Sequence, residues 1–288
     1  MMENKGKAKS PFEDIHSPLE EVPSPLGEPE GASSLLTFGG HLEVLRRMLF
    51  RILGVAGVIA VVVFCFKDTT WRMLLAPSEW NFATYSLIER LIRAIGFADF
   101  RFEEYHVELI ATDLSSQFMT HITTAVYLGL LFASPYILYE LFRFVSPALY
   151  ENERRYSVQV VVVIYVLFVL GVLMSYYVLF PISFRFLGTY SVAERVHSTI
   201  TLDSYVSTFT TLTLLMGVVF QLPVIAFALA KMGMITHDML SAYRKHAFLV
   251  IMVVAAVITP PDLMTLVLVA IPLYLLYEVS IRVVKWAE

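Results

Sequence analysis

The stretch Val158-QVVVVIYVLFVLGVLMSYYVL-Phe180 contains 23 residues and no Asp, Glu, Lys or Arg. It exceeds the roughly 20 residues that a helix needs to cross the hydrocarbon core of a bilayer. Backbone N–H and C=O groups in lipid must be paired within their own segment, so such a stretch is typical of a transmembrane helix. The sequence therefore predicts a helical membrane protein.

Five further apolar stretches follow the same pattern and are separated by charged segments. Apolar residues make up 57% of the 288-residue chain and charged residues 16%, which is outside the balance of ordinary soluble domains. We predict an all-α membrane protein with six transmembrane helices. The other five helices are expected over Leu42–Phe66, Phe118–Val145, Tyr205–Ala230, Phe248–Ile258 and Leu263–Tyr277.

The last two apolar stretches contain only 11 and 15 residues, too few to span an ordinary bilayer. Between them, Thr259-Pro260-Pro261-Asp262 must end a helix, because two prolines in series cannot continue one. We expect a hairpin of two short helices that thins the bilayer locally or is sheltered by its neighbours.

Two segments lie outside the predicted helices. Residues 1–34 are rich in Pro, Glu and Ser and lack a leading apolar run, which predicts a disordered cytoplasmic tail and no secretory signal. Residues 35–288 form the predicted membrane domain, with a long acidic outer loop at about 67–117. Within this loop, the helical spacing of apolar residues over Tyr85–Ile95 predicts a short surface helix.

Basic residues collect at one set of helix ends. Lysine and arginine next to membrane spans favour the cytoplasmic side. A cytoplasmic N-terminus and an even number of spans place both termini on that side. The basic residues that then face the cytoplasm are Arg46, Arg47, Arg51, Arg143, Arg154, Arg155, Lys231, Arg244, Lys245, Arg282 and Lys285.

The sequence contains no HExxH, GxSxG or phosphate-binding Gly-Lys-Ser/Thr pattern, so we expect neither an enzyme nor a cofactor.

Cys65 is the only cysteine, which excludes a disulfide framework, and we expect it to be a small buried apolar residue. His121 and His246 are expected at helix ends rather than as metal ligands. Ionisable residues are essentially missing from the middles of the spans, which argues against a conventional ion pump.

Polar and proline residues interrupt several spans. Gln221 is followed by Pro223, and its amide could cap the backbone group that the proline releases. Alternatively, it could bond to another helix or subunit, an interaction worth on the order of 1 kcal/mol in lipid. Pro135, Pro181 and Pro272 are expected to kink helices and could also curve the bundle.

Carboxylates lie among the basic residues at the expected cytoplasmic face. Glu43 precedes Arg46 in the first span, and Glu151 and Glu153 follow the second. They could anchor the helices at the interface through local salt bridges. They could also bind a cationic ligand, for which two adjacent arginines are suited because guanidinium groups bind carboxylates bidentately.

Four motifs, in order, resemble TatC, the receptor subunit of the twin-arginine protein translocase. They are Phe38-GGHLEVLR-Arg47, Phe144-VSPALYENER-Arg155, Phe220-Gln-Leu-Pro223 and Thr259-Pro-Pro-Asp262, and the resemblance covers about residues 35–288. It implies a concave, glove-shaped bundle of six helices in the cytoplasmic (inner) membrane, with both termini cytoplasmic. It also implies export of folded precursors driven by the proton-motive force, together with TatA- and TatB-type single-span subunits.

The resemblance further implies roles for individual residues. Binding of an Arg-Arg signal peptide would involve Glu43, Arg46, Phe144, Glu151 and Glu153. Gln221 and Thr259 would contact partner subunits, and self-association in the translocon is implied. Structural roles would belong to Pro77, Pro223, Pro260, Pro261 and Asp262.

Several positions depart from the family pattern. Val44 replaces a common glutamate, and the neighbouring Glu43 points about 100° away around a helix. Gln221 replaces a frequent glutamate and cannot titrate, Leu266 replaces an expected glutamine, and the outer loop carries an insertion around residues 82–108.

Our hypothesis for the function is a twin-arginine signal-peptide receptor. A small-molecule secondary transporter is the alternative, although paired inverted segments are not evident, and a purely structural scaffold is a third possibility.

Overall fold

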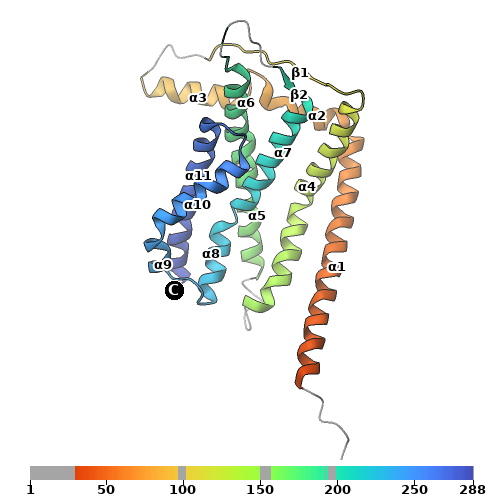
Figure 1. Ribbon diagram of the computed structural model, residues 1–288, viewed down its shortest axis with the longest axis vertical. Coiled ribbons are helices and arrows are strands. Elements are labelled where there is room, and N and C mark those ends of the chain that lie inside the picture. Colours follow the sequence, from red (N-terminus) through yellow and green to blue (C-terminus); the bar gives the residue numbers. More distant parts are fainter. Residues whose placement is uncertain (1–29, 97–101, 150–156, 192, 194–198, 288) are drawn as a thin grey trace, which may run out of the picture. The chain divides into compact units, whose positions relative to one another are not determined.

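The computed structural model describes residues 30–96, 102–149, 157–191, 193 and 199–287. The chain is mostly helical, as predicted (Figure 1). It divides into two units, Met1–Arg46 and Arg47–Glu288. Helix α1 (Glu30–Cys65) begins in the first unit, before the expected start at Leu42. All packing described below lies within the second unit.

Five helical segments are long and apolar enough to cross a membrane, and they correspond to five of the six predicted spans. Helix α10 (Arg244–Ile258) has 15 residues and is short, as predicted. The predicted end of the last helix is wrong, because α11 (Leu263–Ala287) continues past Tyr277 to a length of 25 residues. Glu278 lies within this helix, and Arg244 pairs with its carboxylate. The five segments are Leu42–Cys65, Ser116–Phe144, Val160–Thr189, Leu202–Lys231 and Leu263–Ala287.

Two of these spans are each built from more than one helix. The third span joins α5 (Ser157–Met174), a π-helical turn η2 (Ser175–Leu179) and α6 (Phe180–Thr189), where Pro181 lies in the first turn. The fourth joins α7 (Leu202–Val219) to α8 (Leu222–Lys231) across a break at Gln221. Proline lacks an N–H and fits the first turn of a helix, so a new helix begins at each site.

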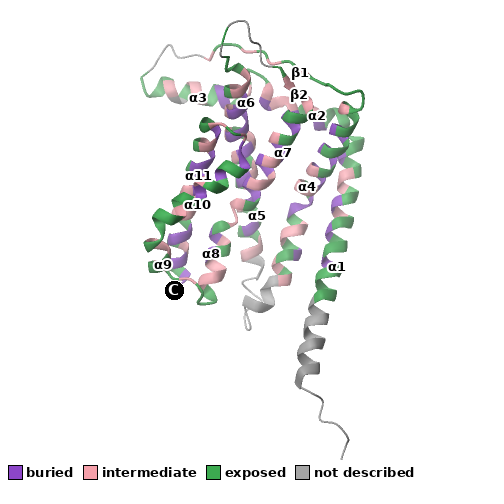
Figure 2. Cartoon of the chain, viewed as in Figure 1, coloured by how far each residue is buried: buried purple, intermediate pink, exposed green. Residues whose placement is uncertain are grey.

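The main core lies between α6, α7, α10 and α11. Phe180 packs edge-to-face against Tyr205 and Phe209, with ring centroids 5.0 Å apart in each pair. Leu212 of α7 and Val269 of α11 are completely buried. Figure 2 shows buried residues on helix faces that turn toward neighbours, whereas the outward faces are exposed and largely apolar. Outward apolar faces are expected of helices surrounded by lipid.

Helix α4 (Ser116–Leu149) packs along α1 through a smaller apolar cluster that contains Val63, Ala125 and Leu128. A Cβ at Gly129 would lie 2.7 Å from the Cβ of Ala60, so the two helices are in close contact there. Small residues permit such close approach between helices in membranes.

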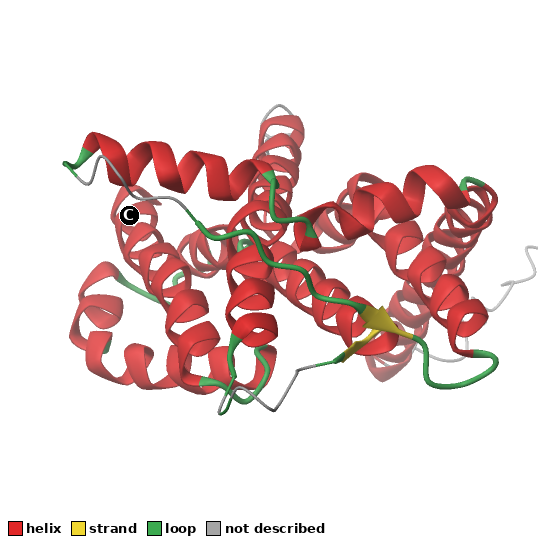
Figure 3. Ribbon diagram, turned by 90° about the horizontal axis from the view of Figure 1, so that it is seen from above, coloured by secondary structure: helices red, strands yellow, loops and turns green. Residues whose placement is uncertain are grey.

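A cap of short elements covers one end of the bundle (Figures 1 and 3). It contains α2 (Lys67–Leu75), the 3₁₀ turn η1 (Ala76–Ser78) around buried Pro77, and α3 (Ala83–Ala94), which confirms the predicted surface helix. Strand β1 (Leu109–Ile110) pairs in parallel with β2 (Ile200–Thr201). Neither α2 nor these strands was predicted. The six-residue helix α9 (His237–Ala242) lies at the opposite end.

Arg185 of α6 fastens the extended segment after residue 101 to the cap. Its guanidinium carbon lies 5.2, 4.5 and 4.7 Å from the ring centroids of Tyr85, Phe102 and Tyr105. Its Nη2 donates to the carbonyl of Glu103 at 2.9 Å. Burial, together with a hydrogen bond to Tyr105, raises the pKa of the Tyr85 hydroxyl above its ordinary value of 10.0.

Candidate functional site

The described residues do not test whether the five predicted signal-binding residues form one site. Glu151 and Glu153 lie outside the described residues. Glu43 and Arg46 are exposed on α1 in the first unit, and Phe144 is partly buried near the end of α4 in the second. Their roles in signal binding stay predictions.

The side chain of Gln221 bonds to another helix, which was one of its two predicted roles. Its bond within its own span goes to Gly217 and not to Val219, the residue whose carbonyl Pro223 leaves without a donor. Its Nε2 donates to the carbonyl of Gly217 in the same span at 3.3 Å, and to the carbonyl of Ile164 in α5 at 3.2 Å. The Gln221 N–H bonds to Val218 instead, which leaves Gly217 for the side chain. Its Oε1 is buried and has no hydrogen-bond partner among the described residues. Because an unpaired buried acceptor costs about 1–3 kcal/mol, this oxygen is a candidate contact for another subunit.

An apolar groove of about 320 Å³ lies beside this break, between α5, α8 and α11. Pro223, predicted to be structural, is buried in the first turn of α8 and contributes to the wall. An uncharged wall at this depth is suited to aliphatic or aromatic side chains. The lining residues are Val160, Val163, Leu167, Pro223, Val224, Phe227, Val279 and Val283.

The turn Thr259-Pro260-Pro261-Asp262 joins α10 to α11, as predicted. Thr259 is buried, and its hydroxyl donates to the carbonyl of Ala255 at 2.9 Å, within its own helix. Asp262 Oδ1 accepts from the N–H of Thr265 at 2.6 Å, which is the geometry of a helix N-cap. Leu266 packs against the main core and offers no polar contact.

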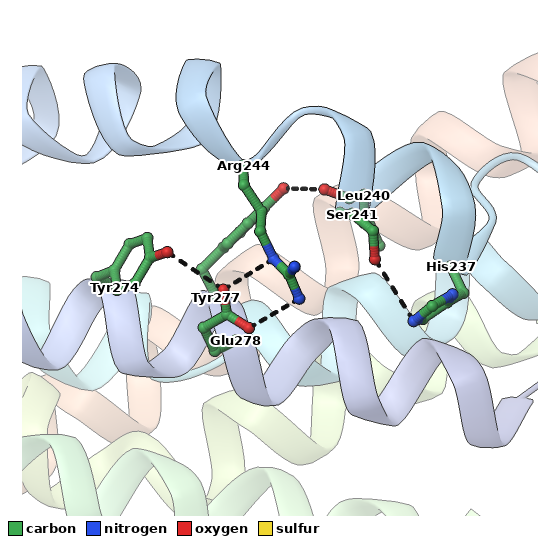
Figure 4. Close-up of polar contacts among 7 residues, drawn as sticks. All are labelled: His237, Leu240, Ser241, Arg244, Tyr274, Tyr277 and Glu278. Carbon is green, nitrogen blue, oxygen red and sulfur yellow. Dashed lines mark hydrogen bonds and ion pairs between the residues drawn. The ribbon is translucent and has the colours of Figure 1, made fainter.

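A polar cluster that sequence reasoning missed joins α9, α10 and α11 (Figure 4). Arg244 and Glu278 form a two-point ion pair, with N···O distances of 3.0 and 3.2 Å. Tyr274 donates to the same carboxylate at 3.2 Å, and Tyr277 donates to the carbonyl of Leu240 at 2.8 Å. The two charged residues are 34 positions apart, so no local pattern could have indicated the pair.

A buried carboxylate also connects α4 to α1. Glu140 is only 6% exposed, accepts from the hydroxyl of Tyr136 at 2.9 Å and lies 3.7 Å from Nη1 of Arg51. A buried charge needs such partners, because removing one leaves it uncompensated. These partners of Glu140 were not predicted from the sequence.

The remaining candidate residues are placed as follows. Cys65 is exposed at the end of α1, so the prediction of a buried residue is wrong. Its side chain lies on the outward face, where lipid can replace a protein core. His121 and His246 lie near the beginnings of α4 and α10, as expected. Among the described residues, no group of three or more His, Cys, Asp or Glu side chains is arranged to hold a metal.

The fold and its outward apolar surfaces define a multi-pass helical membrane protein. Residues 40–272 match the family model "Sec-independent protein translocase protein (TatC)". A relative of that name from Blattabacterium sp. subsp. Periplaneta americana is 31% identical over 86% of this chain and 94% of its own length. One from Carboxydothermus hydrogenoformans is 32% identical over 88% of this chain and 94% of its own.

A solved structure described as "Twin Arginine Translocase Receptor- TatC" superposes with a TM-score of 0.68 and 30% identity, and covers 86% of this chain and 99% of that one. The chain therefore belongs to the TatC family. It is a core subunit of the twin-arginine protein translocase in the inner membrane, and its family is not a catalytic one. The comparisons give no support to the alternative of a small-molecule transporter.

Proposed function

We propose that this protein receives the Arg-Arg signal peptides of folded precursors at the cytoplasmic face of the membrane. The observation that carries this proposal is the match of its fold, over 86% of the chain, to a structure described as a receptor. The family match over residues 40–272 also includes Glu43, Glu151 and Glu153, the predicted signal-binding carboxylates.

The distribution of charge supports a cytoplasmic position for both termini. Lys231 ends α8, Arg244 and Lys245 begin α10, and Lys285 lies in the last turn of α11. These helix ends lie at the end of the bundle that carries α9 and the C-terminus (Figure 1). Because basic residues next to spans favour the cytoplasm, this end is assigned to the cytoplasmic side. The cap at the other end is rich in acids, namely Asp68, Glu79, Glu89, Glu103, Glu104, Glu108 and Asp113.

Signal recognition in this proposal rests on carboxylate–guanidinium chemistry. We assign Glu153 and Glu43 to pair with the two arginines of the signal, and Glu151, Arg46 and Phe144 as further signal-binding residues. Each charge-assisted hydrogen bond contributes about 1.5–3 kcal/mol. Lysine supplies a single ammonium and cannot reproduce the two parallel bonds of arginine, so an Arg-Arg pair is preferred to Lys-Lys.

Partner binding is assigned to the groove between α5, α8 and α11. A single-span helix of a TatA- or TatB-type subunit would pack its apolar side chains against Pro223 and Phe227. Gln221 precedes Pro223 of the groove wall by two residues, and we assign its Oε1, which is unpaired among the described residues, as the acceptor for a polar group on that helix. Thr259 is the second proposed contact, and two copies of this chain would associate within the assembled translocon.

Site-specific photocrosslinking in membranes tests both assignments. A photoreactive residue at Phe227, inside the groove, should crosslink to the single-span partners, whereas one at exposed Val61 on α1 should not. A probe at Phe144 should capture an Arg-Arg precursor, and a probe at Trp80 in the cap should not. Equal crosslinking at Phe227 and Val61 would contradict the partner site, and signal capture at Trp80 alone would contradict the orientation.

A further inference from the structure

A second pocket, of about 410 Å³, lies at the capped end of the bundle. It is separate from the residues assigned to signal and partner binding. Its walls come from α2, the first turns of α4 and the first residue of α7. Its polar lining consists of Lys67, Gln117 and His121, and none of its lining residues is acidic.

The environment of His121 is the first observation that indicates a ligand-binding site. Its side chain is 9% exposed, and its Nε2 is buried without a hydrogen-bond partner in the described part of the chain. The ring stacks on Phe64, with centroids 4.3 Å apart, and lies 6.2 Å from the ring of Trp71. Buried polar atoms are almost always hydrogen-bonded, so this unpaired nitrogen, on a residue that lines the pocket, is a candidate contact for a polar ligand.

The same pocket favours negative charge. Lys67 lies on its wall and forms no ion pair with any residue that the structure describes. Gln117 and Phe118 belong to the first turn of α4, where backbone N–H groups and the helix dipole attract anions. A lysine ammonium, an imidazole nitrogen and a helix N-terminus together are suited to a phosphate group.

The position and the apolar wall of the pocket favour a lipid over a free ion. The first candidate span ends at Cys65, the second begins at Ser116 and the fourth begins at Leu202, so the pocket lies at the level where three spans meet the membrane surface. Trp71 is of the residue type enriched at that level. The apolar part of the wall, which includes Trp71, Leu75 and Leu202, would contact the glycerol and the first acyl carbons.

We propose that this pocket binds one phospholipid of the outer leaflet through the phosphate of its head group. Lys67 and His121 contact the phosphate oxygens, and the first turn of α4 supplies backbone N–H groups. The bound lipid connects α2 to α4 and α7, and so holds the cap on the bundle.

Native mass spectrometry of the full-length protein, purified in detergent and titrated with phosphatidylglycerol, tests this site. Lys67→Gln and His121→Phe should each weaken binding of the first lipid by about tenfold or more, as expected for loss of a contact to a charged group. His121→Phe keeps an aromatic ring stacked on Phe64. Lys67→Arg keeps the positive charge that Lys67→Gln removes, so it should bind the first lipid as the unmodified protein does. Arg72→Gln is the matched control, since Arg72 is exposed on α2 and does not line the pocket.

Equal affinity for the first lipid in the reference protein, Lys67→Gln and His121→Phe would overturn the proposal. Inorganic phosphate serves as the second probe. Little displacement of lipid by a large excess of phosphate supports a lipid site. Binding of phosphate alone, lost in the same two variants while lipid binding is unchanged, would assign the pocket to a free anion and overturn the lipid assignment.

Discussion

Replacing Gly171 by alanine should force α5 away from α7. A Cβ at this position would lie 2.5 Å from the backbone oxygen of Met216 and 2.9 Å from Cγ of Phe220. The backbone oxygen cannot rotate away, so one helix must move. Gly57 is the matched control, because a Cβ there meets nothing within 4 Å.

The expected difference in stability between the two variants follows from two opposing effects. Alanine stabilises a helix by about 1 kcal/mol relative to glycine, and this gain applies equally to both variants. Overpacking at Gly171 costs about 1–3 kcal/mol, and only this variant bears it. The two variants should therefore differ by about 2 kcal/mol. For a chain of this size, that difference corresponds to roughly 4–8 °C in apparent melting temperature.

The assay is thermal unfolding in detergent, followed by the loss of the monodisperse peak in size-exclusion chromatography. Gly57→Ala should melt at or above the temperature of the unmodified protein, and Gly171→Ala should melt below it. A melting temperature for Gly171→Ala equal to that of Gly57→Ala would refute the close packing of α5 against α7.

Three further predictions use the same unfolding assay. Asp262→Ala removes the cap on the N–H of Thr265 and should cost about 1 kcal/mol, so an unchanged melting temperature would contradict the N-cap. Gln221→Leu removes two donated bonds but also an unpaired acceptor, so stability should change by less than about 1 kcal/mol while copurification of single-span partners falls; full partner recovery would exclude the contact. Burial raises the pKa of Tyr85 above 10.0, so its stabilising contribution is complete below pH 10 and is lost at higher pH. Between pH 9 and 11 the melting temperature should therefore fall less for Tyr85→Phe than for the unmodified protein, and parallel curves would count against this role.

Hydropathy and proline positions predicted most of the helical framework. Long uncharged stretches form helices in lipid whatever their neighbours, so four full-length spans and short α10 were found. The break before Pro223 and the turn at Thr259–Asp262 follow from the backbone chemistry of proline, which is local. Gln221 was identified because a polar side chain beside a proline is conspicuous in an apolar span.

Features that depend on distant partners were not predictable in this way. The prediction ended the last helix too early, because a charged residue after an apolar stretch indicates the membrane interface. The pairing of Arg244 with Glu278 is a contact between distant residues, which the sequence alone does not reveal. The pairing of β1 with β2 depends on two short segments about ninety residues apart. The exposed side of Cys65 and the orphaned nitrogen of His121 depend on which helix faces meet, which periodicity alone does not specify.

Recognition of two arginines at the cytoplasmic face can be measured by copurification of a folded precursor with Glu153→Gln. Glu104→Gln is the control, because Glu104 is an exposed carboxylate in the cap at the opposite end. The unmodified protein and the control should capture an Arg-Arg precursor in preference to a Lys-Lys precursor, whereas Glu153→Gln should lose most of this preference. Undiminished, arginine-dependent capture by Glu153→Gln would contradict the proposed role of that carboxylate.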